Sequence, residues 1–198
     1  MNSGDPPRLL APGVGVLLGY VLVIGSPWLN RDLQNSLTDT DSALRLIDVM
    51  VFYPSWQLDP GIFGPFQFWS ANLRTILFVG FAIAGLTRVS RWLRESAGGM
   101  GVFVATVGAI ALSAVAAGMA AAVIVTTLLD EPVIFPTSSG RLTAEYFLGQ
   151  LSASASFGVL FGLVLGAVVV AQRQSPAAAA RRPERAAKRR TNTPKSFW

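Results

Sequence analysis

Few side chains in this 198-residue chain can do chemistry, because the sequence contains no Cys and no His. Without Cys there is no thiol catalysis, no disulfide, no iron–sulfur cluster and no Cys–zinc site. Without His, the usual general base, the usual haem ligand and the imidazole metal ligand are missing as well. We therefore expect no catalytic residues, no cofactor and no metal site.

The remaining polar candidates gather around Arg74, which stands at the start of an apolar run. A charge at the centre of a membrane span costs about 2.5–3.5 kcal/mol on insertion scales, and less near its end. Arg74 either extends its side chain to the membrane surface or pairs with a carboxylate, for which Glu145, Asp130 and Glu131 are candidates. The predicted polar patch consists of Arg74, Glu145, Gln150 and Ser154. Its spacing matches no metal site, no nucleophile–base pair and no phosphate-binding loop.

The elements that must position this patch are long and apolar. The chain is 52% hydrophobic and 14% charged, whereas soluble domains carry about 25% charged residues. Four apolar stretches approach or exceed the ~20 residues that cross ~30 Å of hydrocarbon. They are residues 9–29, 70–93, 100–129 and 146–171. We predict an all-α integral membrane protein, with a four-helix transmembrane bundle over residues 1–171. The first stretch is interpreted as a retained span, not a signal peptide.

The basic residues predict the orientation. They are concentrated between the second and third stretches and in the tail, residues 172–198, while the connection 30–69 is acidic. Because Lys and Arg favour the cytoplasmic side, we expect both termini in the cytoplasm and the 30–69 connection outside. Abundant Arg, Ala, Gly and Val suggest a GC-rich bacterial genome. The predicted location is therefore the plasma (inner) membrane of a bacterium.

Two of the apolar stretches carry small residues at every fourth position, which places them on one helix face. These rows are Gly158, Gly162 and Gly166 in the last stretch and Ala109, Ser113 and Ala117 in the third; Ala114, Gly118 and Ala122 form a second row beside the latter. In lipid, small residues let two helix backbones approach closely. We expect these two stretches to pack against each other. A docking face for another subunit is the alternative.

The connection 30–69 contains two further features. Residues Asp39 to Tyr53 have helical period, with one apolar and one charged face, and predict an amphipathic helix on the outer membrane surface. The Pro- and Gly-rich residues that follow exclude a long regular element there. They carry aromatic side chains suited to a membrane–water belt or to a partner-binding loop. The candidate partner residues are Trp56, Phe63, Phe66 and Trp69.

The tail 172–198 predicts disorder, since Arg, Lys, Pro and Ala dominate and no apolar period remains. Its basic cluster adjoins a span, and each charge near an anionic lipid surface contributes about 1 kcal/mol. The predicted lipid-contact residues are Arg181, Arg182, Arg185, Lys188, Arg189 and Arg190. Because aromatic residues do not interleave with these charges, we expect no nucleic acid partner.

These features favour a non-enzymatic small membrane protein, an accessory or scaffolding subunit of a bacterial cell-envelope complex. Its partners would be membrane lipids and other membrane protein subunits. The first alternative is a transporter, or a transporter subunit working as an oligomer. Against it, the spans hold almost no ionisable groups and show no broken helix or inverted repeat. The second alternative is a membrane enzyme acting on lipid-linked substrates at the outer face, with Arg74 and nearby carboxylates as its working groups.

Overall fold

The computed structural model describes residues 11–37, 49–51, 53–92, 98–128 and 142–174. Every regular element in these ranges is an α-helix, so the prediction of an all-α fold is confirmed there. In chain order the helices are α1 (Ala11–Val23), α2 (Pro27–Leu37), α4 (Pro60–Trp92), α5 (Gly99–Leu128) and α6 (Leu142–Gln174).

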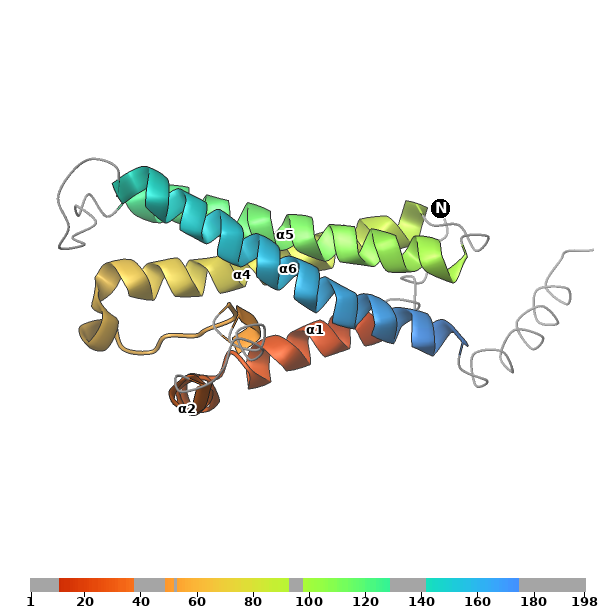
Figure 1. Ribbon diagram of the computed structural model, residues 1–198, viewed down its shortest axis with the longest axis horizontal. Coiled ribbons are helices and arrows are strands. Elements are labelled where there is room, and N and C mark those ends of the chain that lie inside the picture. Colours follow the sequence, from red (N-terminus) through yellow and green to blue (C-terminus); the bar gives the residue numbers. More distant parts are fainter. Residues whose placement is uncertain (1–10, 38–48, 52, 93–97, 129–141, 175–198) are drawn as a thin grey trace, which may run out of the picture.

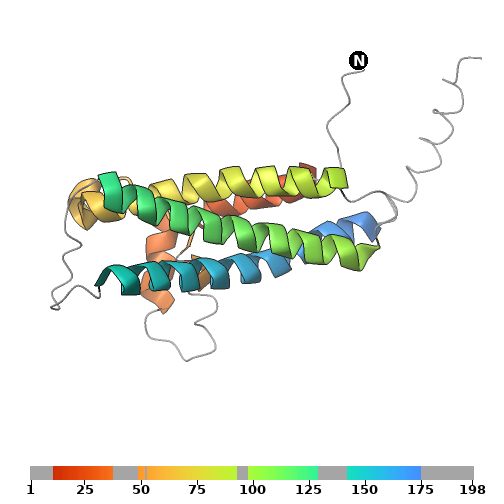
Figure 2. The ribbon, with the colours of Figure 1, turned by 90° about the horizontal axis from the view of Figure 1, so that it is seen from above.

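Three of these helices are long and apolar enough to cross a membrane: Gly64–Arg91 of α4, Gly99–Leu128 of α5 and Ala144–Gln172 of α6. At 1.5 Å per residue each is about 42–45 Å long, which exceeds the ~30 Å of bilayer hydrocarbon. The three run side by side, with α5 in contact with both α4 and α6 (Figures 1 and 2). Three of the four predicted apolar stretches are therefore membrane-compatible helices.

The first predicted span, residues 9–29, is different in the structure. Within the described residues, helix α1 covers 13 residues from Ala11, or about 20 Å of rise, and it ends at Val23. The chain turns at Gly25, where an added Cβ would lie 2.9 Å from the carbonyl oxygen of Pro54. Pro27 then starts α2 at the first helical position, which needs no backbone N–H donor. A turn thus interrupts the expected span. Apolar composition continues through this turn, so hydropathy alone did not reveal it.

The start of α4 corrects a second expectation. We expected no long regular element before residue 70, yet α4 begins at Pro60 and is interrupted only at Gly64, with φ 78° and ψ 156°. Only glycine adopts such a positive φ without strain. Pro65 follows as the first residue of the continuing helix, a position that tolerates proline. Phe66 and Trp69 are therefore helical residues and do not belong to a loop.

Two predicted segments lie largely outside the described residues. Of the amphipathic helix expected from Asp39 to Tyr53, only 49–51 are described as helical. The basic tail residues between 181 and 190 are not described at all, so their lipid contacts stay a prediction. Helix α6 extends to Gln174, two residues past the predicted start of the tail at residue 172.

The core contains a continuous group of aromatic rings from four parts of the chain. Tyr53 stacks on Phe157 of α6 with ring centroids 4.1 Å apart, and Phe157 stacks on Phe161 at 5.6 Å. Tyr20 of α1 lies 4.5 Å from Phe161, and Phe78 of α4 meets Tyr53 edge-on at 5.7 Å. Such pairs contribute about 0.5–1.5 kcal/mol each beyond the burial of their area. The rings join α1 and Tyr53 to α4 and α6.

The glycine row of α6 faces the backbone of α5. An added Cβ on Gly158 would lie 2.7 Å from the Cα of Ala111, and one on Gly162 would lie 3.1 Å from the Cα of Val107. At Gly166 the nearest atom would be a phenylalanine ring carbon at 2.9 Å. The two helices therefore approach closely along this row, most closely at Gly158, where an added Cβ would overlap the backbone of α5.

Helix α5 uses two rows of small residues for two neighbours. Ala109 and Ser113 lie against Gly85 of α4, where an added Cβ would be 3.5 Å from the Ala109 Cβ and 3.4 Å from the Ser113 hydroxyl. The adjacent row faces α6: a Cβ on Gly118 would lie 3.1 Å from a serine Cβ of that helix. Ala117 is fully buried. We expected the row of Ala109 and Ser113 opposite the glycines of α6, but it packs against α4.

Candidate functional site

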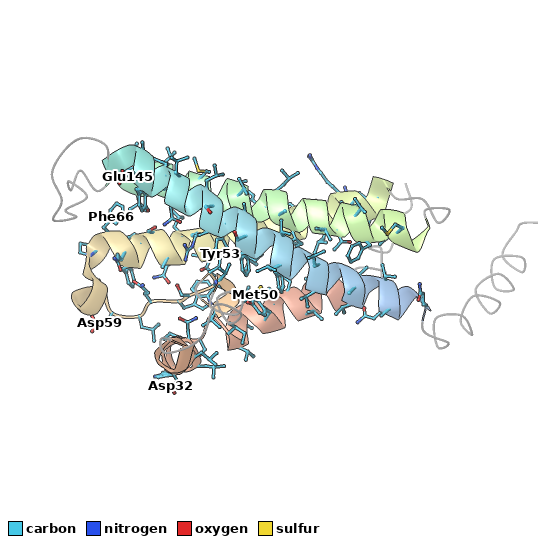
Figure 3. The ribbon with its side chains drawn as sticks, viewed as in Figure 1. Asp32, Met50, Tyr53, Asp59, Phe66 and Glu145 are labelled. Atoms are coloured by element: carbon cyan, nitrogen blue, oxygen red, sulfur yellow. The ribbon has the colours of Figure 1, made fainter. Side chains whose placement is uncertain are left out.

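The most unusual feature is a non-helical stretch that enters the bundle between α2 and α4. We call residues 50–59 the inserted segment: residues 50 and 51 end a short helical stretch, residues 53–59 are non-helical, and residue 52 lies outside the description. Tyr53 is only 2% exposed, and its hydroxyl donates to the carbonyl of Ala114 at 2.6 Å. Its ring contacts those of Phe78 and Phe157. Ala114, Phe78 and Phe157 each lie within one residue of the midpoint of a membrane-compatible helix. Tyr53 thus lies halfway along the bundle (Figure 3).

The last helical carbonyls and the non-helical backbone of this segment need hydrogen-bond partners from the rest of the protein, because an unsatisfied buried carbonyl is costly. Helices α1 and α2 supply the first donors. The Tyr20 hydroxyl donates to the carbonyl of Met50 at 2.5 Å. The Asn30 side-chain amide donates to the carbonyls of Val51 at 2.5 Å and of Ile24 at 3.1 Å. Asn30 therefore joins the end of α1 to the start of the inserted segment.

Helix α4 supplies the remaining donors from residues close together in the sequence. The amide of Asn72 forms a reciprocal pair with the backbone of Gln57, since its Nδ2 donates to the carbonyl at 2.9 Å and its Oδ1 accepts from the N–H at 3.0 Å. Arg74 donates from Nη2 to the carbonyl of Tyr53 at 3.0 Å. The α4 residues that bond to this backbone are Asn72, Arg74 and Thr75.

Arg74 connects three parts of the structure. Besides its bond to Tyr53, it donates from Nη1 to the side-chain oxygen of Gln150 on α6 at 3.3 Å. Its guanidinium carbon also lies 4.6 Å from the centre of the Tyr53 ring, a cation–π contact. Arg74 stands one helical turn before Phe78, which lies at the midpoint of the membrane-compatible part of α4. These contacts are with a carbonyl, an amide and a ring within the bundle.

The predicted polar patch is only partly assembled. Gln150 bonds to Arg74, and Ser154 is fully buried one helical turn further along α6, beside Tyr53. Glu145 is exposed near the start of α6, away from Tyr53 (Figure 3). Asp130 and Glu131, the other carboxylates considered for Arg74, lie outside the described residues. The structure therefore brings together Arg74, Gln150 and Ser154 and leaves Glu145 apart.

The four aromatic residues of the predicted partner loop do not form one surface. Trp56 points inward, and its indole N–H donates to a carbonyl of α1 at 3.3 Å. Phe66 packs on Tyr146 with ring centroids 5.6 Å apart. Trp69 is 54% exposed, and the side chain of Phe63 is not described. Of the three whose side chains are described, Trp56, Phe66 and Trp69, only Trp69 exposes most of its surface.

The Tyr53 hydroxyl acts as a hydrogen-bond donor. A phenol is protonated at neutral pH. The bond to the Ala114 carbonyl requires that proton.

Sequence reasoning missed the residues that hold the inserted segment, chiefly Tyr53, Asn72 and Asn30. One signal was available: Asn72 stands two positions before Arg74 in a stretch whose other residues are mostly apolar. Two strongly polar residues so close together at the start of a membrane helix indicate a polar surface inside the protein. Asn30 gave no such signal, because the sequence analysis placed it in the outer connection 30–69, where a polar residue is ordinary.

In the described ranges no cluster of three or more Asp and Glu residues could hold a metal ion. Comparison with protein-family models, with curated proteins and with solved structures finds no match. The arrangement of the site is therefore the basis for a functional proposal. Its polar groups are suited to holding a non-helical backbone deep in the bundle.

A conservative change tests the bond at the middle of the bundle. Tyr53→Phe keeps the ring contacts but removes the donor to Ala114, and we expect a loss of about 1–2 kcal/mol in the free energy of unfolding. Tyr146→Phe is the matched control, because it removes a hydroxyl that lies 3.2 Å from the Ser70 hydroxyl in a partly buried place. Unfolding in mixed micelles with increasing dodecyl sulfate measures both. An effect of Tyr146→Phe as large as that of Tyr53→Phe would contradict the assignment.

Proposed function

We propose that this chain is a non-enzymatic integral membrane protein, an accessory or scaffolding subunit of a bacterial cell-envelope complex with both termini in the cytoplasm. The observation that carries the proposal is the use of its buried polar groups. Arg74, Asn72 and Asn30 bond to the backbone of the inserted segment, so they serve architecture. Buried polar groups that bond to the protein's own backbone make its framework rigid. A rigid framework is suited to presenting a fixed surface to a partner.

The partner surface we propose lies where the inserted segment leaves the bundle. Leu58 is 68% exposed there, and Trp69 is exposed on α4. Trp69 is one of the four partner residues predicted from the sequence, and Leu58 lies in the same connection, residues 30–69. Large apolar side chains held on a rigid support lose little freedom on binding, which favours them as contact residues. On the proposed orientation this surface faces outside.

A pull-down from the native membrane in mild detergent, followed by mass spectrometry, tests the proposal. We expect the wild-type chain to co-purify with foreign membrane subunits, and the double variant Leu58→Ala, Trp69→Ala to lose them several-fold. Leu112→Ala is the matched control, since this side chain is 72% exposed but lies near the middle of α5. Recovery of the wild-type chain only as a homodimer would contradict the subunit proposal.

One observation favours the transporter alternative. Helix α1 ends at Val23 inside the predicted first span. Non-helical residues of the inserted segment bond to the turn that follows, where the Trp56 N–H donates to the carbonyl of Gly25 at 2.9 Å. Transporter sites are often built from such discontinuous helices near the bilayer midplane. The sequence analysis argued against a transporter because it expected unbroken helices. That argument no longer holds. A homodimer in the pull-down would make transport the better proposal, whereas the separation of Glu145 from Arg74 gives no support to an enzyme.

A further inference from the structure

Helix α2 runs across the three long helices. It is viewed end-on in Figure 1, where α4, α5 and α6 extend horizontally, and it crosses them in the view of Figure 2. A helix with this orientation lies in the plane of a membrane that the long helices span. This inference rests on that crossing and does not depend on the proposed subunit role.

Hydrogen bonds hold α2 at a defined level of the bundle. It starts at Pro27, four residues after α1 ends at Val23. Asn30, in its first turn, donates to the carbonyl of Val51, two residues before Tyr53. Figure 1 places α2 between the middle of the bundle and the end where α4 begins. The helix therefore lies beside the half of the bundle that contains the inserted segment.

The two sides of α2 differ in chemistry. Asn30 is buried and Leu33 is half-buried, which defines the side toward the protein. On the other side Trp28 is 77% exposed, and Asp32 is also exposed one helical turn later; Leu29, one turn before Leu33, is 39% exposed at the edge of this side. An indole with a polar N–H, a leucine and a carboxylate match the boundary between lipid acyl chains and headgroups.

We propose that α2 lies in the membrane plane at the headgroup boundary and that Trp28 and Leu29 bind among the phospholipids of one leaflet. Phospholipid fits this face better than a protein helix does. A face packed against a membrane helix would have to bury the Asp32 carboxylate, whereas at the headgroup boundary that carboxylate reaches water while the indole stays in lipid. The surface thus has a lipid as its partner.

The chain contains no Cys, so single cysteines can be labelled with a nitroxide without background changes. Trp28→Cys and Leu29→Cys report on α2, Leu112→Cys on the exposed middle of α5, and Asp59→Cys on an exposed position of the inserted segment. The labelled full chain is placed in vesicles of phosphatidylcholine and phosphatidylglycerol. Electron paramagnetic resonance then compares collisions of each label with oxygen, which concentrates in lipid, and with a water-soluble nickel complex. Thermal unfolding confirms that each labelled chain is folded.

We expect the oxygen-to-nickel accessibility ratio at both α2 positions to lie between the two controls. It should be several-fold above that of Asp59→Cys and below that of Leu112→Cys. A ratio equal to that of Asp59→Cys would place α2 in water and overturn the proposal. A ratio equal to that of Leu112→Cys would place it in the acyl core, and low collision with both agents would show protein covering this face; either result overturns it too. Two independent positions keep the test valid if one variant fails to fold.

Discussion

Replacing Gly158 with alanine is expected to destabilise the bundle by about 1–3 kcal/mol, the usual range for overpacking. The added Cβ would lie 2.7 Å from the Cα of Ala111 and 2.9 Å from the Cβ of Ala114. One of these atoms belongs to the backbone of a long helix, so it cannot move aside as the end of a flexible side chain would. The two helices would have to separate along the row, with loss of close contacts that drive association in lipid.

Gly149→Ala is the matched control for this change, because Gly149 also belongs to α6 but has no atom within 4 Å of an added Cβ. It should leave stability unchanged or raise it by about 0.5–1 kcal/mol, the helix preference of alanine over glycine. Unfolding by dodecyl sulfate in mixed micelles, followed by circular dichroism, measures both variants. Equal midpoints for Gly158→Ala and Gly149→Ala would show that α5 and α6 do not approach as described.

Replacing Arg74 with methionine is expected to destabilise the protein by about 2–4 kcal/mol, since a buried acceptor left without its donor costs about 1–3 kcal/mol. The change leaves the Tyr53 carbonyl and the Gln150 side-chain oxygen without the donors that Arg74 provides. It also removes the cation–π contact with Tyr53. Removing the buried charge of Arg74 also removes its desolvation cost, which opposes this destabilisation. Because methionine has no hydrogen-bond donor to replace the guanidinium, we expect net destabilisation.

Arg88→Met is the control for Arg74→Met, because Arg88 belongs to the same helix and is exposed. We expect it to change the free energy of unfolding by less than about 0.5 kcal/mol. A second readout separates local release of the inserted segment from global loss of structure. Hydrogen exchange at the backbone amides of Trp56 and Gln57 should accelerate in Arg74→Met more than exchange in the middle of α5. Uniform acceleration, or none, would contradict the role we assign to Arg74.

The sequence was most informative for the long helices. A run of apolar residues long enough to cross a bilayer is a local property, so residues 100–129 and 146–171 were predicted within a few residues of α5 and α6. The glycine row was equally local. The partner row on α5 was misassigned, because α5 carries two rows of small residues and periodicity alone does not say which neighbour each row meets.

The first stretch shows the limit of the same reasoning. Hydropathy is high from residue 9 to residue 29, but the helix ends at Val23 because the chain must turn at Gly25 beside Pro54. That turn depends on the inserted segment, which is distant in the sequence. Arg74 was recognised as exceptional for a membrane helix, whereas its contacts with Tyr53 and Gln150 join residues 21 and 76 positions apart.

By itself, therefore, the sequence determined the class of protein, the long apolar helices and the chemistries that a chain without Cys or His lacks. These follow from composition and short-range periodicity, because they decide whether each segment is more stable in lipid or in water. Only the tertiary structure decided that a non-helical segment enters the bundle, that Asn30, Asn72 and Arg74 bond to its backbone, and that Glu145 stands apart. The physical reason is that buried carbonyls away from water must find donors, and the nearest donors in space belong to helices far apart along the chain.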